Sequence, residues 1–459
     1  MARRDIPVKK NTIYEVDIED LGSRGEGIGR VDGYTLFIEG ALPGELVEAK
    51  VTKINKNYGF ARLMKILGKS PARTKAFCEY FDRCGGCQLW HMNYNNQLKY
   101  KRKVVENALV RIGKIEDIDV KPTMGMKNPM RYRNKAQFPI GSDGKNAKIG
   151  FFRRRSHDIV DMDVCLIQHE VNDRIMAIIR EFIDRYKIPV YDEKCHRGII
   201  RHVVTKIGFN TGEIMAVIVT NGEKLPHQDK LVSELKYNIE GIKSIVQNIN
   251  PRKGNVILGK DNRTLWGKDF IEDTIGKYRF RISPLSFYQV NPVQTEILYN
   301  KVLEYADLSG KEIVFDLYCG IGTISLFLSK YAGKVYGIEI VEDAVKDARI
   351  NARLNAVDNA EFILGRAEDM AIDMMRDGIV PDVVVLDPPR KGCDIKLLET
   401  IADIKPEKII YVSCNPATLA RDLGPLRKYG YEVQRVQPVD MFPFTVHVET
   451  VCLMSREEK

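Results

Sequence analysis

Long apolar runs are missing from this sequence of 459 residues, and their absence excludes a membrane-spanning helix. The basic amino terminus, MARRDIPVKKN, is followed by no apolar stretch of the kind that a secretory signal needs. Internal repeats and low-complexity tracts are also absent, which excludes a repeat architecture. We therefore expect a globular protein of the cytoplasm, long enough for two or three domains, with no membrane partner.

Acidic residues are missing from one long stretch of the chain and scarce in another. Residues 49–78 hold eight Lys or Arg and no acid, and residues 121–157 hold ten against one acid, whereas the whole chain has a net charge of only +9. Aromatic and amide side chains alternate with the basic ones in KINKNYGFARLMK, RYRNKAQF and GFFRRRSH. This mixture suits phosphate contacts combined with base stacking, which favours RNA. The candidates for RNA contact in the second segment are Arg131, Arg133 and Lys135.

The pattern of apolar residues predicts three regions. Residues 13–66 consist of short alternating strands divided by glycine turns, which predicts a small closed β-barrel of the OB type. Residues 122–282 mix strand and helix patterns, so an α+β region is expected there. The last third alternates apolar runs with helical segments, and such units build a parallel sheet covered on both faces. The predicted fold class is therefore α/β, with a Rossmann-like domain that follows an OB-like barrel and an α+β central domain.

The apolar runs of the last third end at acidic side chains, and ligands of such sheets bind beyond the carboxyl ends of the strands. Asp316 opens DLYCGIGT, a glycine turn that lacks the G-x-G-x-x-G spacing, and Asp387 opens DPPR. Glu339 ends the second strand, where it can accept hydrogen bonds from both hydroxyls of a ribose. Three acidic strand ends would repel a pyrophosphate but suit the cationic cofactor S-adenosylmethionine. A methyltransferase domain is therefore predicted, rather than a nicotinamide-binding one.

One cysteine, Cys414, follows the fifth apolar run, in YVSCNP. Most free cysteines are buried structural thiols, but this one belongs to the same rim as the predicted cofactor pocket. Methylation of an oxygen or an exocyclic nitrogen requires no thiol, whereas C5 of a pyrimidine becomes nucleophilic only after a group has added at C6. Cys414 is therefore predicted to be the nucleophile that adds there.

The covalent intermediate must lose its C5 proton, so the mechanism also requires a base. The segment FPFTVHVETVCLM is expected to form a final strand that carries two candidates, His447 and Glu449. A histidine in a strand is commonly a packed one, whereas a carboxylate within an apolar strand is harder to explain structurally. Either residue could take the proton.

Taken together, these motifs resemble the RNA uracil-5-methyltransferase family. SFYQVN, DLYCGIGT, DPPR, VSCNP and HVET occur in the family's order, and the amino-terminal barrel resembles the TRAM domain, which binds RNA. The resemblance covers essentially the whole chain. The implied domains are the TRAM barrel at 1–70, a central RNA-binding domain at 71–285 and a catalytic domain at 286–459, on which helix 94–114 is expected to pack.

The resemblance also implies roles for individual residues. Cys414 would be the nucleophile, Glu449 the general base, and Phe287 would stack on the target base. The target base must leave its RNA stack to reach the thiol. S-adenosylmethionine would be bound by the residues that match the family's cofactor motifs: Gln289, Tyr318, Glu339 and Asp387.

Four further cysteines could bind a metal. Cys78, Cys84 and Cys87 have C-x5-C-x2-C spacing, and Cys165 lies in DMDVCLIQHE. Four thiolates can hold zinc or an iron–sulfur cluster, and the spacing differs from the C-x3-C-x2-C of enzymes that cleave S-adenosylmethionine reductively. The family resemblance favours a structural [4Fe–4S] cluster with Cys165 as its fourth ligand, as in the family's ribosomal RNA enzymes.

Three functions compete. The barrel and the four cysteines favour a 23S ribosomal RNA (uracil-5-)-methyltransferase that acts on one or two uridines. The second possibility is the same chemistry on the T-loop uridine of tRNA. The third is an inactive iron–sulfur module that binds RNA, against which the intact SCNP, DPPR and HVET motifs argue. RNA rather than DNA is the expected partner, and a monomer is expected because the basic segments suit one RNA footprint.

Overall fold

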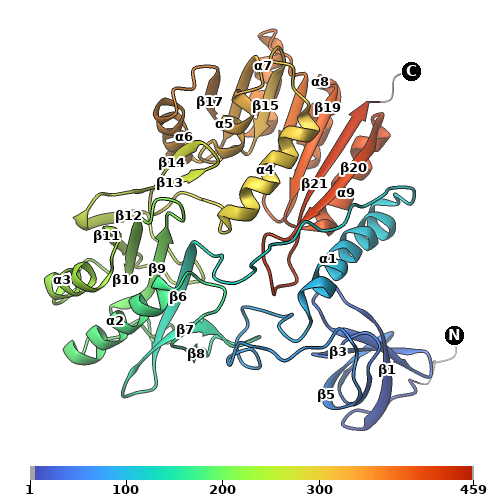
Figure 1. The fold of residues 1–459 in the computed structure, drawn as a ribbon, viewed down its shortest axis with the longest axis vertical. Helices are drawn as coiled ribbons and strands as arrows, with labels where there is room; N and C mark the ends of the chain where they lie inside the picture. Colours follow the sequence, from blue (N-terminus) through green and yellow to red (C-terminus); the bar gives the residue numbers. More distant parts are fainter. Residues whose placement is uncertain (1–5, 457–459) are drawn as a thin grey trace.

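The computed structural model describes residues 6–456, so residues 1–5 and 457–459 of the predicted domain ranges lie outside the described part. A β-barrel, a mixed central domain and a C-terminal α/β domain are arranged around a junction crossed by loops (Figure 1). Among the described residues, no helix is long and apolar enough to cross a membrane.

Five strands close the amino-terminal barrel in the order β1-β2-β3-β5-β4. Alternate residues of the strands point inward, and Leu36 and Ile38 are among those that form the core. Gly29 has no room for a side chain, because a Cβ there would lie 2.4 Å from the carbonyl oxygen of Asp17. The predicted barrel is confirmed, with these bounds: β1 Ile13–Leu21, β2 Gly27–Val31, β3 Tyr34–Glu39, β4 Leu46–Ile54 and β5 Tyr58–Gly68.

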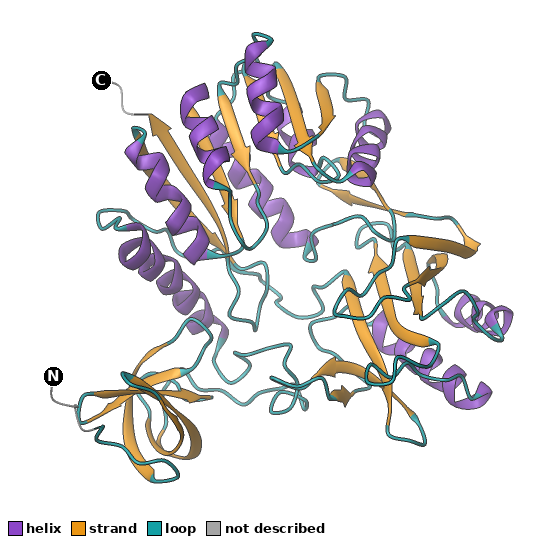
Figure 2. Ribbon diagram, turned by 180° about the vertical axis from the view of Figure 1, so that it is seen from behind, coloured by secondary structure: helices purple, strands orange, loops and turns teal. Residues whose placement is uncertain are grey.

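A single helix joins the barrel to the far end of the chain. Helix α1, Tyr94–Ala108, is capped by the Asn93 side chain, which accepts a hydrogen bond from the Asn96 N–H. It continues as one π-helical turn, Leu109–Gly113, and packs against α9, Pro416–Lys428. Figure 2 shows α1 beside the C-terminal domain, away from the central sheet. The helix is therefore close in space to residues more than 300 positions later in the chain.

The central domain is a seven-stranded sheet in the order β12-β11-β10-β9-β6-β7-β8. Every residue of β10 is buried, because one face of the sheet packs on α2 and α3 and the other faces the hairpin β13-β14. Its elements are β6 Lys135–Ser142, β7 Ala147–Phe152, β8 Ile159–Asp161, α2 Val171–Tyr186, β9 Ile200–Ile207, β10 Ile214–Thr220, α3 Gln228–Asn238, β11 Ile242–Ile249, β12 Asp261–Gly267, β13 Ile271–Ile275 and β14 Tyr278–Ile282.

The C-terminal domain is a second seven-stranded sheet, in the order β17-β16-β15-β18-β19-β21-β20. The first five strands are parallel, and β21 runs in the opposite direction to the other six strands of this sheet. The chain moves outward in opposite directions from β15 and β18, so a crevice opens where their carboxyl ends meet. Its elements are α4 Pro292–Ala306, β15 Ile313–Leu317, α5 Thr323–Ser329, β16 Lys334–Glu339, α6 Glu342–Leu354, β17 Ala360–Leu364, α7 Ala367–Arg376, β18 Val383–Leu386, α8 Ile395–Ile404, β19 Lys408–Ser413, α9, β20 Tyr431–Val439 and β21 Glu449–Arg456.

The predicted α/β fold class is confirmed, and each apolar run of the last third is a strand. One prediction about the final strand was wrong. His447 lies before β21, in a loop that follows β20, and only Glu449 belongs to the strand. Phe444 has a φ of +65° within this loop, a left-handed conformation that no regular strand contains.

Candidate functional site

A cavity of about 870 Å³ lies at the carboxyl ends of the parallel strands of the C-terminal domain. We call it the strand-end cavity. It is lined from the ends of β15, β16, β18 and β19, from the start of β21 and from the loop before α4. It brings together all of the predicted catalytic and cofactor residues and the predicted stacking residue: Cys414, Glu449, Gln289, Tyr318, Glu339, Asp387 and Phe287.

The glycine turn after β15 shapes one side of this cavity. Tyr318 has a φ of +69°, and its backbone N–H donates to the carbonyl of Ile338, which ties the turn to β16. The Glu339 carboxylate accepts backbone N–H bonds from Gly320 at 3.1 Å and Val341 at 2.9 Å. These two bonds fix the carboxylate at the strand end, where it faces the cavity.

Asp316 does not line the strand-end cavity, contrary to the prediction that three acidic strand ends face the cofactor. Its side chain is fully buried beneath the glycine turn and accepts a hydrogen bond from the Ser325 hydroxyl. Burial raises its pKa to about 7. Asp387, directly after β18, does line the cavity, and burial raises its pKa to about 7 as well. Of the three predicted acidic strand ends, Glu339 and Asp387 therefore line the cavity.

Cys414 and Glu449 face the same cavity from adjacent strands. Ser413, the last residue of β19, pairs with Thr450 of β21, so the residues next to this pair meet at one edge of the sheet. Burial, followed by the negative charges of Glu449 and Asp387, raises the pKa of the Cys414 thiol to about 11. Burial and the charge of Asp387 raise the pKa of the Glu449 carboxyl to about 8. A carboxylate of that basicity is suited to accept a proton near neutral pH.

Arg390 also belongs to this site, although no role was predicted for it from the sequence. It lines the strand-end cavity directly after the two prolines that follow Asp387. Its positive charge lowers the pKa of both Cys414 and Glu449, against the larger effect of burial. Because the DPPR motif contains this arginine, the sequence could have placed it near the cofactor pocket. Its proximity to the Cys414 thiol, however, depends on the packing of β18 beside β19.

His447, the second candidate base, does not line the strand-end cavity. It lies in the wall of a neighbouring cavity of about 550 Å³, together with Arg24 of the barrel and Arg153 and Arg155 of the central domain. Burial, followed by the charge of Arg390, lowers the pKa of His447 to about 4. The geometry therefore favours Glu449 over His447 as the base.

The four predicted metal ligands line one small cavity of about 120 Å³ between the 78–87 loop and the segment before α2: Cys78, Cys84, Cys87 and Cys165. Burial raises the pKa of all four thiols, repulsion from neighbouring cysteines adds to the effect at Cys78, Cys87 and Cys165, and the pKa of Cys165 rises to about 11. Within residues 6–456, no group of three or more His, Cys, Asp or Glu side chains converges tightly enough to hold a single metal ion. The cysteines thus line one cavity, but they form no metal-binding group within those residues, and the predicted iron–sulfur cluster stays a prediction.

The three basic residues predicted to contact RNA have different surroundings. Arg131 is engaged within the protein, because it donates to the carbonyl of Cys165 and pairs with Asp173 at 2.7 Å. Arg133 lines the cysteine cavity and lies over the ring of Phe442 at 5.8 Å. Lys135 is half-buried on β6. None of the three lines the strand-end cavity, and their contact with RNA stays a prediction.

Comparison with known proteins identifies the family. The profile of the tRNA (uracil-5-)-methyltransferase family matches residues 93–457, and that of the TRAM domain matches residues 7–64. The chain belongs to the tRNA (uracil-5-)-methyltransferase family. This finding confirms the predicted family and the TRAM assignment of the barrel.

Relatives within this family span the whole chain. A protein of Clostridium tetani called an uncharacterized RNA methyltransferase is 53% identical, with 99% of this chain and 98% of the relative covered. A protein of Halalkalibacterium halodurans with the same description is also 53% identical, with 99% of both chains covered. The crystal structure of the Pyrococcus abyssi tRNA (uracil-54, C5)-methyltransferase in complex with S-adenosyl-L-homocysteine is 31% identical, with a TM-score of 0.78 over 96% of this chain and 99% of that one.

Proposed function

We propose that the protein methylates C5 of a uridine in RNA, with S-adenosylmethionine as the methyl donor and Cys414 as a covalent nucleophile. One observation carries this proposal: a thiol and a carboxylate of raised pKa face the same cavity as the residues that match the family's cofactor motifs. A methyltransferase acting on oxygen or nitrogen has no use for this pair, because those atoms already carry lone pairs.

The cofactor fits the side of the cavity formed by the glycine turn. The Glu339 carboxylate, held by two backbone N–H groups, would accept hydrogen bonds from the ribose hydroxyls. Tyr318, Gln289 and Asp387 would hold the remainder of the molecule. S-adenosylmethionine supplies an electrophilic methyl group on a sulfonium cation, and the two acidic side chains suit its positive charge.

The chain's own groups provide the rest of the reaction. The Cys414 thiolate adds to C6 of the uracil, and the displaced electron pair makes C5 nucleophilic enough to take the methyl group. Arg390 supports this step because its charge favours the thiolate. The Glu449 carboxylate then accepts the C5 proton, and the electrons of the broken C–H bond restore the ring double bond as the Cys414 sulfur leaves. Phe287, which is 62% exposed beside the cavity, would stack on the flipped base.

Two adjoining cavities provide a positively charged route for the RNA toward this site. The cavity that contains His447 is lined by four arginines: Arg24, Arg153, Arg154 and Arg155. It shares Arg153 and Arg155 with a cavity of about 820 Å³ that reaches the barrel at Arg62 and Phe60. Arginine beside an aromatic ring suits phosphate and base contacts to single-stranded RNA.

We propose 23S ribosomal RNA as the substrate and a [4Fe–4S] cluster at the four cysteines. Two observations support the cluster: the family resemblance, and the position of all four cysteines in the wall of one cavity. The cluster would be structural, joining the 78–87 loop to the central domain. The alternative substrate, a tRNA, is supported by the likeness to the Pyrococcus abyssi enzyme.

Covalent trapping tests the chemistry. RNA transcribed with 5-fluorouridine should form an adduct that survives denaturation, because fluorine at C5 prevents proton loss. Cys414→Ala should abolish both adduct and methylation, whereas the matched control Cys195→Ala, which changes an exposed cysteine outside these cavities, should preserve both. Methylation by the Cys414 variant at an appreciable rate would refute the covalent route, and a wild-type protein without adduct would favour an inactive RNA-binding module.

Mapping of 5-methyluridine tests the substrate. Ribosomal RNA and tRNA from cells with and without the gene should differ at one or two uridines of 23S RNA. Loss of the methyl group from the T-loop of tRNA instead would preserve the proposed chemistry and reject ribosomal RNA as the substrate.

A further inference from the structure

The loop of residues 440–448, which joins β20 to β21, leads directly into the predicted base Glu449. Phe442 of this loop lines the strand-end cavity, and His447 lines the cavity of the proposed RNA route. The 440–448 loop therefore contributes to the walls of both cavities. Glu449 pairs with Val439 across the two ends of this loop, so the conformation of the loop affects the position of the Glu449 carboxylate.

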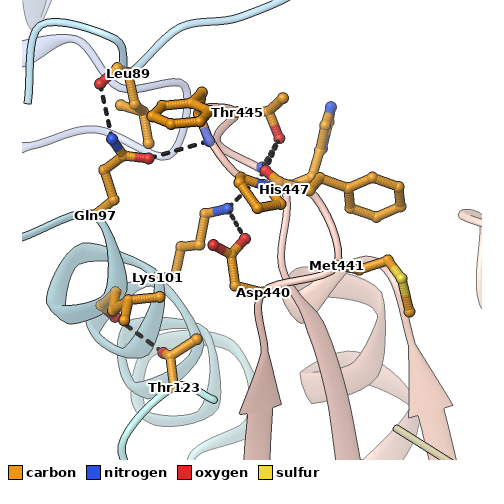
Figure 3. A network of polar contacts seen from close by, with 12 residues as sticks. Leu89, Gln97, Lys101, Thr123, Asp440, Met441, Thr445 and His447 are labelled. Carbon is orange, nitrogen blue, oxygen red and sulfur yellow. Dashed lines mark hydrogen bonds and ion pairs between the residues drawn. The ribbon is translucent and has the colours of Figure 1, made fainter. Parts of the chain in front are cut away.

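A fully buried ion pair anchors the start of this loop. Lys101 of α1 pairs with Asp440, and both side chains have no exposed surface. The Lys101 ammonium also donates to the carbonyl of Phe442 at 2.9 Å, and the hydroxyl of Tyr94 donates to the second Asp440 oxygen at 2.8 Å. Figure 3 shows Lys101 reaching from α1 to Asp440, with His447 farther along the same loop.

Other contacts hold the middle of the loop to the same helix and to the cysteine segment. Gln97 of α1 is fully buried and accepts a hydrogen bond from the Phe444 N–H at 3.1 Å. The ring of Phe444 stacks on Trp90, with centroids 3.7 Å apart and planes within 5°. Trp90 lines the cysteine cavity. The loop is thus fixed by segments that lie far earlier in the chain, with 347 positions between Gln97 and Phe444.

A buried ion pair of this kind is poor evidence for stability, because an apolar pair of similar volume can stabilise a core as well or better. Apolar side chains, however, cannot donate a hydrogen bond to the Phe442 carbonyl, so they would not hold the loop in this one conformation. We propose that Lys101 and Asp440 are positioning residues that hold the 440–448 loop so that Glu449 meets the C5 proton. This inference rests on the proposed function, since it assigns the pair to the proton-loss step.

The neutral double variant Lys101→Met/Asp440→Asn tests the proposal. It removes both charges with little change of volume, and Asn can still accept the Tyr94 hydrogen bond. Because a slightly misplaced catalytic group lowers a rate steeply, we expect kcat to fall by about tenfold or more, with the KM for S-adenosylmethionine unchanged. If proton loss is slow, a covalent adduct between the protein and ordinary RNA should also accumulate. This adduct should contain a methyl group transferred from labelled S-adenosylmethionine. The matched control is Lys103→Met, the same substitution on the exposed side of α1, where Lys103 pairs with Asp20.

Trp90 provides a readout that does not depend on activity. The chain has two tryptophans, so Trp266→Phe leaves Trp90 as the single reporter of the stack on Phe444. In this background the double variant should show increased acrylamide quenching, whereas Lys103→Met should not. A folded double variant with unchanged quenching and wild-type kcat would overturn the proposal.

Two further outcomes keep the inference separate from the proposed function. If the wild type forms no adduct with 5-fluorouridine RNA, the proposed function fails, whatever the Trp90 readout. The wild type forms the adduct with 5-fluorouridine RNA if the proposed function is right. If the double variant then loses turnover without accumulating methylated adduct on ordinary RNA, the assignment of Lys101 and Asp440 to proton loss is wrong. Should the double variant fail to fold, Tyr94→Phe keeps the ion pair and removes one bond to Asp440. It should accumulate the same adduct to a smaller extent, and a wild-type level of adduct would overturn the proposal.

Discussion

Replacing Glu449 with Gln should make the protein more stable at alkaline pH while it slows the reaction. The carboxyl has a pKa of about 8 in the folded protein against 4.5 without the fold, because burial and Asp387 oppose its ionisation. Between these two values the unfolded chain has released the proton and the folded chain retains it, so stability falls as pH rises. A shift of roughly 3.5 pH units corresponds to about 5 kcal/mol at pH 8 and above. Gln bears no charge and avoids this loss.

The assay is thermal or urea unfolding of wild type and Glu449→Gln from about pH 4 to 9. The variant should be more stable by up to about 5 kcal/mol above pH 8, and the difference should shrink to zero below about pH 4.5. Glu399→Gln, which changes an exposed residue of α8, is the matched control and should show no such trend. A difference that does not vary with pH, or a variant less stable than the wild type at pH 8, would refute the reasoning.

The remaining predictions concern charge, metal and base stacking. Arg390→Met removes the charge that lowers the pKa of Cys414 and Glu449, so the pH–rate profile should shift to higher pH, and an unshifted profile would contradict this. Cys87→Ser should lose the brown colour and bound iron, measured by absorption and elemental analysis; a colourless, zinc-containing wild type prepared without oxygen would reject the iron assignment. Phe287→Ala should weaken RNA binding by about 1–3 kcal/mol in a filter-binding assay, with S-adenosylmethionine binding unchanged, and equal RNA affinity would exclude stacking.

The sequence alone located the strands of the last third and the side chains at their ends. Alternation of apolar runs with helical segments is a local pattern, and the carboxyl ends of parallel strands necessarily share one edge. For this reason Glu339, Asp387 and Cys414 could be assigned to one site from their motifs alone. The barrel could be predicted on the same grounds, because its alternating strands and glycine turns are also local.

The electrostatics of the site could not be read in this way. That Asp316 lies beneath the glycine turn, and Asp387 in the cavity wall, depends on packing between strands rather than on either motif. The final strand was predicted to include His447. In the structure the chain has a left-handed turn at Phe444, and the strand begins only at Glu449. The residues alone left both candidate bases open and only the family resemblance chose Glu449, whereas the fold places the two in different cavities.

The sequence by itself determined the fold class, the family and most of the residues that it predicted for the strand-end cavity, because each is encoded by short motifs or by local periodicity. Only the tertiary structure decided which carboxyl has a raised pKa, since desolvation depends on everything packed around a group. It alone brought Lys101 to Asp440 across 339 residues of chain. No local pattern specifies such a contact, because it forms only when α1 has packed beside the C-terminal sheet.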